Sequence, residues 1–234
     1  MERLDKIIAN QTSYSRKDTK KLVSSKRVKV NGEVALKTDI KVDLDKDVIT
    51  IDGNPINVKE HVYLMLHKPK GYISATRDGK EPTVIELVPE EYSHRELFPA
   101  GRLDKDTTGL MIITDDGELA HNILAPKKHV KKTYNVTLDI PVNEKMVKGF
   151  AEGVNLNDGV CKTALMEITG EYTARVTLTE GRYHQIKRMF GCFGGKVVEL
   201  ERIKMGNLEL PADLKLGECR ELTEKELKLL QEIV

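Results

Sequence analysis

The sequence predicts an α+β fold with a mixed, largely antiparallel sheet. Segments of strand type dominate the chain, and helical segments are inserted between them. The regular strand–helix alternation that is typical of a doubly wound parallel fold is absent. Because residues 53–61 are polar and contain Gly and Pro, they predict a linker. We therefore expect a small domain over residues 1–59 and a larger one over residues 60–234.

The first sixty residues predict two helices and a small sheet. Residues 3–11 place apolar side chains at helical spacing, and Ser15 begins a capping box for a second, basic helix. The dipeptide Asn31-Gly32 lies between alternating residues, which is a strong hairpin signal. Residues 47–53 predict a further strand. We therefore expect a small domain of helices and a hairpin, with basic side chains on one side.

The larger domain is expected to combine strands with short helices. The apolar and alternating segments predict strands at 62–68, 110–114, 132–138, 163–168, 172–179 and 196–200. The remaining periodic segments predict helices at 82–89, 115–124, 143–152, 182–190 and 223–233.

Composition excludes several classes of protein. Hydrophobic residues make up 39% of the 234 residues and charged residues 32%, as expected for a folded chain with a solvated surface. No segment approaches the roughly 20 apolar residues that cross a bilayer, and the first residues lack a secretory pattern, so we expect a cytoplasmic protein. The three cysteines are far apart and form no CxxC pair, so neither a zinc site nor a disulfide is expected.

The net charge of +1 carries no information about partners, but its distribution does. Residues 1–31 hold nine Lys or Arg against three Asp or Glu, and residues 181–204 hold six against two. Residues 32–59 reverse the balance, with four against six. Basic charge gathered in particular segments favours contact with phosphates, although each cluster alone is also typical of a solvated helix face.

The segment GRLDKDTTGL, residues 101–110, places turn-forming chemistry directly before a buried strand. Its glycines allow tight turns, and Thr107 and Thr108 are expected to bond backbone groups of the loop. Asp104 would then be held at the head of a sheet. Two alternatives remain open, namely a simple turn between strands and a metal pair formed by Asp104 and Asp106, which lacks a third ligand nearby.

Residues 179–190, TEGRYHQIKRMF, predict a basic helix that opens at Gly181 and Arg182. A cation on this helix could lower the pKa of a facing aspartate and keep it ionised. The alternative is a basic helix on the surface. The basic side chains that the helix brings within about a turn of one another are His184, Lys187 and Arg188.

Two further segments combine basic residues with tyrosines. In residues 127–136, four Lys and a His precede Tyr134, an arrangement that suits a stacked base beside a phosphate backbone. A core tyrosine on a strand is the alternative. Residues 67–74, HKPKGYIS, are either part of the same site or a simple turn.

Together these segments resemble the pseudouridine synthases that modify ribosomal RNA, in both order and separation. The matching segments are GRLDKDTTGL, KPKGY, KKTY and EGRYHQIKRMF. The phrase RYHQIKRMF is similar to the branch that contains the bacterial small-subunit enzyme. The N-terminal residues resemble the S-four RNA-binding domain, which binds RNA mainly through shape and phosphates. The residues that carry this second resemblance are Arg3-Leu4-Asp5, Ser15-Arg16 and Arg27-Val28-Lys29-Val30-Asn31-Gly32.

The resemblance implies an enzyme that converts uridine to pseudouridine after base flipping, with no cofactor and no metal. It implies that Asp104 is the catalytic carboxylate, that Lys187 forms its salt bridge and that Tyr134 stacks on the target base. Arg102 would fill the space left by the extruded base, and Ile186 would pack against the uracil. We expect substrate contacts from Arg102, Arg182, His184, Ile186 and Arg188. We expect RNA contacts from Arg3, Arg16, Lys17, Lys20, Lys21, Arg27, Lys29, Lys68, Lys131 and Lys132.

The expected partner is ribosomal RNA, as 16S rRNA or a small-subunit assembly intermediate, and the expected state is a monomer that does not bind membranes. Three alternatives remain open. The first is a large-subunit (23S) rRNA pseudouridine synthase, and the second is a non-catalytic RNA-binding assembly factor. The third is a nuclease that uses Asp104 and Asp106 with a divalent metal.

Overall fold

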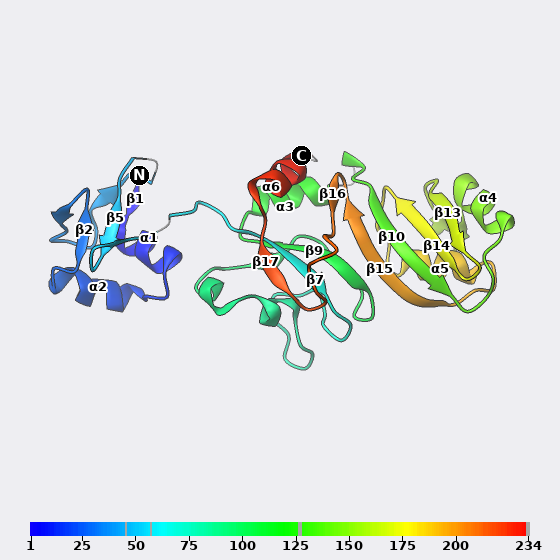
Figure 1. Ribbon diagram of the computed structural model, residues 1–234, viewed down its shortest axis with the longest axis horizontal. Helices are drawn as coiled ribbons and strands as arrows, with labels where there is room; N and C mark the ends of the chain where they lie inside the picture. Colours follow the sequence, from blue (N-terminus) through cyan, green and yellow to red (C-terminus); the bar gives the residue numbers. More distant parts are fainter. Residues whose placement is uncertain (45, 57, 126–127, 233–234) are drawn as a thin grey trace. The chain divides into compact units, whose positions relative to one another are not determined.

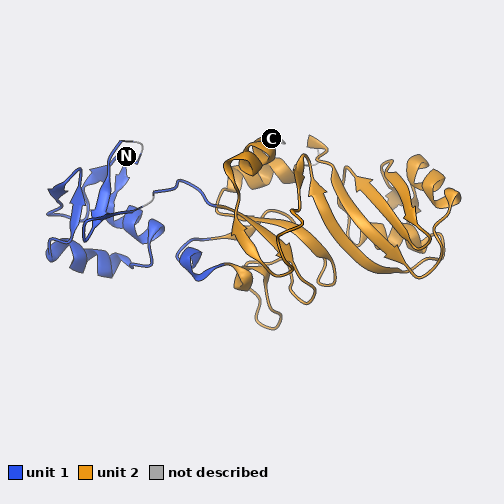
Figure 2. Cartoon of the chain, viewed as in Figure 1, with its two compact units in different colours: residues 1–62, 89–96 blue, residues 63–88, 97–234 orange. Residues whose placement is uncertain are grey.

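The computed structural model describes residues 1–44, 46–56, 58–125 and 128–232. Residues 45, 57, 126, 127, 233 and 234 lie outside the described residues, and they include Asp45, Asn57, Lys127 and Ile233 of segments interpreted above. The chain forms two compact units, shown in Figure 2. The first comprises residues 1–62 with 89–96, and the second comprises residues 63–88 with 97–234. The domain boundary after residue 59 stays a prediction. No helix within the described ranges is long and apolar enough to span a bilayer.

The first unit contains the predicted pair of helices and small sheet (Figure 1). Ser15 caps the second helix through the expected capping box, and the turn at Asn31 and Gly32 has positive φ at both residues. The helices are α1 (Leu4–Gln11) and α2 (Arg16–Ser24). The strands are β1 (Glu2–Arg3), β2 (Val28–Val30), β3 (Glu33–Val34), β4 (Lys41–Val42), β5 (Ile49–Ile51) and β6 (Asn54–Pro55).

Part of the predicted linker 53–61 belongs to this small sheet, since β6 pairs with β5 in the order β3-β2-β5-β6. The two helices pack their apolar faces onto the sheet and form a separate core. The fully buried side chains of this core include Leu4, Ile8, Val28 and Val42.

The second unit is built on a nine-stranded sheet. Seven strands follow the path β13-β14-β10-β15-β9-β7-β17, and off this path β16 pairs with β15 and β8 pairs with β9. Only the β15–β9 pair is parallel among the described pairings of this sheet, so the predicted mixed, largely antiparallel architecture is confirmed. The strands are β7 (Tyr63–Lys68), β8 (Phe98–Pro99), β9 (Thr108–Thr114), β10 (Lys132–Leu138), β13 (Leu165–Gly170), β14 (Thr173–Leu178), β15 (Val197–Met205), β16 (Leu208–Glu209) and β17 (Cys219–Glu221). A small separate hairpin is formed by β11 (Asn155–Leu156) and β12 (Gly159–Val160).

The helices of the second unit follow the predicted order, with two differences. They are α3 (Gly117–Leu124), α4 (Glu144–Glu152), α5 (Gln185–Gly191) and α6 (Glu224–Gln231). The helix expected over 82–89 is a short 3₁₀ helix, η1 (Val84–Leu87), and a second, η2, spans Glu90–Tyr92 in the first unit. The helix expected to open at Gly181 and Arg182 begins at Gln185, because His184 has a left-handed φ of 48° that no α-helix continues.

A close backbone approach joins the two halves of the large sheet. Gly109 on β9 lies opposite Arg202 on β15 in the parallel pair, and its φ is +110°. A Cβ atom at this position would lie 2.2 Å from the Arg202 carbonyl oxygen. Only glycine satisfies both the conformation and the spacing, so Gly109 permits the contact that places β15 beside the end of the 101–107 loop.

We expect Gly109→Ala to lower the free energy of unfolding by about 3 kcal/mol or more, because strained backbone and a steric clash act together. Gly117→Ala is the matched control, since that residue begins α3 with open space around it and no positive φ. It should be neutral or stabilising by up to about 1 kcal/mol. Urea unfolding of both variants checks this, and equal midpoints would contradict the proposed constraint.

Candidate functional site

The loop that carries Asp104 joins β8 to β9 and is held from one side by the last residue of β7 and the segment that follows it. Lys68 is fully buried, and its ammonium donates hydrogen bonds to backbone carbonyls of the loop. The acceptors are the carbonyl oxygens of Pro69 at 3.0 Å, Asp104 at 3.1 Å, Lys105 at 3.3 Å and Thr107 at 2.9 Å. Burial is the main reason that the pKa of Lys68 is lowered to about 8.

The expectation that Lys68 contacts RNA is therefore wrong. A side chain with no exposed surface and four backbone acceptors cannot reach a phosphate. The segment 67–74 is more than a simple turn, because two further groups hold the same loop. The Gly71 N–H donates to the Lys105 carbonyl at 2.8 Å. The Ser74 hydroxyl donates to the Leu103 carbonyl at 2.7 Å and accepts from its N–H at 2.9 Å.

The two threonines do not stabilise the loop in the way the sequence suggested. The buried Thr107 hydroxyl has no hydrogen-bond partner among the described residues. The Thr108 hydroxyl makes a long contact of 3.4 Å to the Leu200 carbonyl on the neighbouring strand. Lys68 and Ser74 satisfy the loop backbone instead, which leaves the hydroxyl groups without that role.

Asp104 faces two basic side chains at the start of α5, those of Lys187 and His184. The Lys187 ammonium lies 3.2 Å from Asp104 Oδ2 and 2.5 Å from Asp106 Oδ1. The His184 Nε2 atom lies 3.6 Å from Asp104 Oδ1. The expected approach of Lys187 to Asp104 is thus present. A lysine ammonium lies between the two carboxylates that the metal-pair interpretation requires.

The contact between Lys187 and Asp106 shifts the pKa values of both side chains. The hydrogen bond from Lys187 lowers the pKa of Asp106 below the ordinary carboxyl value. Burial alone would lower the pKa of Lys187, but hydrogen bonds and charges from Asp106 and Asp104 raise it above its usual value. Lys187 therefore carries a positive charge at neutral pH, and its ammonium lies beside both Asp104 and Asp106.

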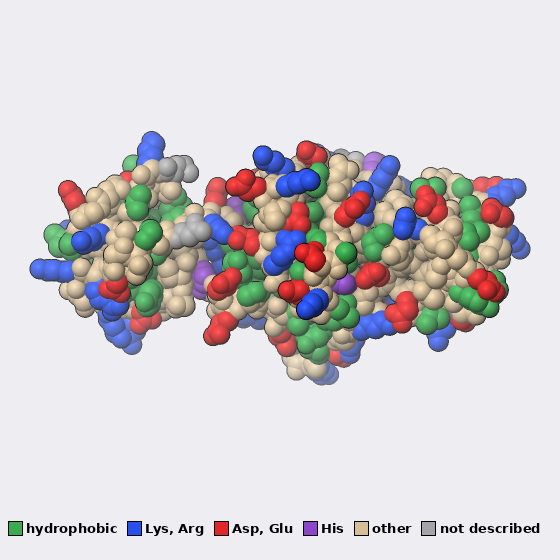
Figure 3. All heavy atoms as spheres, in the orientation of Figure 1, with side chains coloured by type: hydrophobic (Ala, Val, Ile, Leu, Met, Phe, Trp, Pro, Cys, Tyr) green, Lys and Arg blue, Asp and Glu red, His purple; other side chains and the backbone are tan. Residues whose placement is uncertain are grey.

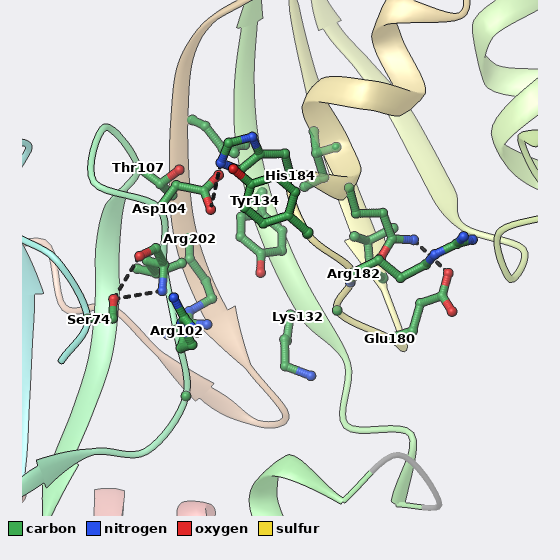
Figure 4. Close-up of a pocket in the computed structure, with 18 of the residues that line it drawn as sticks. Ser74, Arg102, Asp104, Thr107, Lys132, Tyr134, Glu180, Arg182, His184 and Arg202 are labelled. Carbon is green, nitrogen blue, oxygen red and sulfur yellow. Dashed lines mark hydrogen bonds and ion pairs between the residues drawn. The ribbon is translucent and has the colours of Figure 1, made fainter. Parts of the chain in front are cut away.

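Asp104 lines a cavity of about 800 Å³ in the second unit, and this volume is within the range of small-molecule sites. Figure 4 shows Tyr134 and His184 beside Asp104, with Arg182 across the cavity. Tyr134 projects from β10 and is 9% exposed, so the core position considered for it and its place in the pocket are compatible. The sequence-predicted residues that line this cavity are Arg102, Asp104, Lys132, Tyr134, Arg182, His184, Ile186 and Lys187.

One expected substrate contact does not line the cavity. Arg188 donates to Asp158 and to the Tyr183 carbonyl instead. Asp158 also binds Arg182 at 2.5 Å, and these two arginines hold the pKa of Asp158 far below its usual range. Arg188 thus fixes the turn before α5 to the β11–β12 hairpin, and it is not placed to contact a bound base.

The expected RNA contacts of the first unit are exposed, and several have partners. On the face shown in Figure 3, Lys and Arg side chains gather over α2. Arg3 is ion-paired with Asp5 at 2.9 Å, and Arg27 is ion-paired with Asp52 at 2.5 Å. Lys21 lies 3.9 Å from Asp18. The remaining exposed cations of this set are Arg16, Lys17, Lys20 and Lys29. In the second unit Lys131 is exposed, whereas Lys132 is half-buried in the cavity.

Arg202 and Ser74 also line the cavity. Arg202 lies within the basic stretch 181–204 but outside the four candidate site segments of the sequence, and Ser74 is the last residue of the segment 67–74. A signal for Arg202 was present: it occupies the inward position that follows Leu200 in an alternating strand, where an apolar residue is the norm. Ser74 had no comparable signal, because its contact to Leu103 joins residues 29 positions apart.

Comparisons with known proteins agree with this geometry. Residues 62–191 match the family model of RNA pseudouridylate synthase, and residues 2–49 match that of the S4 domain. The chain is 43% identical to the RNA pseudouridine synthase YtzG of Bacillus subtilis, over 98% of each chain. It is 44% identical to ribosomal small subunit pseudouridine synthase A of Escherichia coli, over 96% of this chain and 98% of that one.

A solved structure described as a pseudouridylate synthase superimposes with a TM-score of 0.69 at 39% identity, and covers 98% of this chain and 100% of that one. The resemblance seen in GRLDKDTTGL and the other segments is thereby confirmed at the level of sequence and fold. The chain belongs to the RNA pseudouridylate synthase family and carries an N-terminal S4 domain.

Proposed function

We propose that this protein converts a specific uridine of 16S ribosomal RNA, free or within a small-subunit assembly intermediate, to pseudouridine. We place this activity in the cytoplasm and assign it to a monomer that needs no cofactor and binds no membrane. The observation that carries the proposal is Asp104, which is held beside Lys187 at a cavity that Tyr134 also lines. The names of relatives that modify the small subunit favour 16S over 23S rRNA.

The reaction breaks the bond from uracil N1 to ribose C1′ and forms a bond from C5 to C1′. The proton on C5 leaves and N1 gains one, so no atom is lost overall and no redox partner is required. Asp104 is the catalytic carboxylate in this proposal. Attack on the sugar, attack on the base and deprotonation of the sugar all require a positioned carboxylate, and the Lys187 ammonium holds Asp104 Oδ2 at 3.2 Å.

The other cavity residues serve to hold the extruded uridine. Tyr134 stacks on the base, Ile186 packs against the uracil, and Arg102 at the exposed rim fills the space that the base leaves. Extrusion costs on the order of a few kcal/mol. Phosphate contacts from exposed lysines of α2 in the S4 domain offset part of this cost elsewhere on the RNA.

The competing functions fit the site less well. A nuclease would need a divalent ion between Asp104 and Asp106, where the Lys187 ammonium lies. Among the described residues, no group of three or more His, Cys, Asp or Glu side chains is arranged to hold a metal. A non-catalytic assembly factor would have no use for an aspartate, a lysine and a tyrosine gathered at one cavity.

Pseudouridine mapping in ribosomal RNA tests the function. We expect cells that lack the gene to lose one pseudouridine from 16S rRNA and to regain it when the wild-type gene is restored. The Asp104→Asn protein should restore none while binding RNA within a few-fold, because the amide keeps the size of the side chain and removes its charge. Loss of a 23S pseudouridine would move the substrate to the large subunit, and restoration by Asp104→Asn would remove Asp104 from the mechanism.

Two sets of lysines should have separable effects. Lys187→Met should lower the single-turnover rate at saturating enzyme by about 10²-fold or more, because Asp104 loses its cation and its position. Lys20→Ala with Lys21→Ala should leave that rate intact and weaken RNA affinity, with a salt dependence shallower by roughly 0.7 to 0.9 per lost phosphate contact. An intact saturated rate with weakened affinity for Lys187→Met would reassign Lys187 as a backbone contact.

A further inference from the structure

One buried guanidinium in the cavity has a donor without a partner. Arg202 is 2% exposed, and its Nε donates to the Leu110 carbonyl at 2.8 Å. Its Nη2 atom is buried and has no hydrogen-bond partner among the described residues, although Arg202 lines the cavity. Because buried polar groups are nearly always paired, an unpaired donor in a binding cavity indicates that a ligand supplies the acceptor.

Lys132 brings a second positive charge to the same part of the cavity. Arg202 and Tyr134 are direct partners across β15 and β10, so their side chains share a face of the sheet. Lys132 precedes Tyr134 by two residues on β10 and therefore lies on that face as well. Figure 4 shows Lys132, Arg202 and Arg102 toward the side of the cavity away from His184.

These cations lack negative partners. Within the described part of the chain, neither Arg202 nor Lys132 forms an ion pair, and the Lys132 ammonium donates only to the Val130 carbonyl, at 3.2 Å. Burial and the charge of Arg202 both lower the pKa of Lys132. Two neighbouring, partly desolvated cations without a carboxylate are costly in the free protein, and an anion bound between them would remove that cost.

We propose that Arg202 and Lys132 bind a phosphate group of the uridine that enters the cavity. The proposal rests on the function above and adds a subsite to it. A phosphate carries a full negative charge and accepts from both side chains, whereas a neutral uracil carbonyl would balance neither cation. Lys132 and Tyr134 are about 7 Å apart along the strand, which suits a phosphate beside Lys132 and its own base beside Tyr134. Binding the phosphate would position the ribose at Asp104.

Nucleotide binding to the full-length protein tests this site without knowledge of the target RNA. Uridine, uridine 5′-monophosphate and uridine 3′-monophosphate are titrated while amide resonances are followed by NMR. We expect one monophosphate to bind wild-type protein about tenfold or more tightly than uridine. The isomer that shows the gain identifies which phosphate of the nucleotide occupies the subsite.

The gain should disappear in Lys132→Met and fall in Arg202→Lys, which keeps the positive charge but loses the guanidinium, and with it both the Nη2 donor and the Nε bond to the Leu110 carbonyl. Lys204→Met is the control, because Lys204 lies on the same strand as Arg202, pairs with Glu209 at 2.7 Å and does not line the cavity. It should keep the full gain. The amide spectra themselves report whether each variant is folded.

Two outcomes would overturn the proposal. One is equal binding of uridine and both monophosphates by the wild-type protein, including no detectable binding of any of them. The other is a full gain retained in either folded variant, Lys132→Met or Arg202→Lys. The tighter binding of a monophosphate could depend on Lys132 and Arg202 while rRNA mapping shows no lost pseudouridine. That result would support the phosphate subsite and contradict the proposed RNA substrate.

Discussion

The position of Asp104 depends on one buried ammonium. Lys68 gathers four backbone carbonyls, three of them from the loop that carries the aspartate, and so fixes the loop backbone from beneath. Burying a charge is costly, which the lowered pKa of Lys68 reflects, and the cost is offset only while the carbonyls are in place. The loop and the lysine therefore stabilise one another, and Ser74 adds a second attachment at Leu103.

The remaining parts of the site are set against this fixed loop. The positive φ of Gly109 allows β15 to approach, which brings Arg202 to the cavity, and β10 beside it presents Tyr134. From the other side, the first turn of α5 places Lys187 beside Asp104. The same lysine also binds Asp106, which is the more exposed of the two carboxylates. Asp106 thereby holds the ammonium in place, so that Asp104 faces a positioned cation at longer range.

Much of this arrangement could be predicted from the sequence, since it follows local rules. Local patterns correctly predicted α2 from the cap at Ser15, the hairpin turn at Asn31 and Gly32, and β10 from the alternation along 132–138. What failed depends on tertiary contacts. A buried lysine and an RNA-binding lysine look alike in a sequence, so Lys68 was misassigned, and the start of α5 was displaced by the left-handed His184. Arg202 carries a charge at an inward-facing position of β15, and only the structure shows that this charge lines the cavity.

The most direct test of the central claim is the single-turnover rate of Lys68→Met at saturating enzyme, measured with its ribosomal RNA substrate below the unfolding midpoint of the variant. Methionine keeps an unbranched stem that is shorter than lysine only by the terminal nitrogen, and it removes all the hydrogen bonds to the loop. If Asp104 depends on Lys68, the rate should fall by about 10²-fold or more while RNA affinity stays within a few-fold. The reason is that displacing a catalytic group by about 1 Å can lower the rate by that factor. A rate within twofold of the wild-type value would show that the loop holds Asp104 without Lys68.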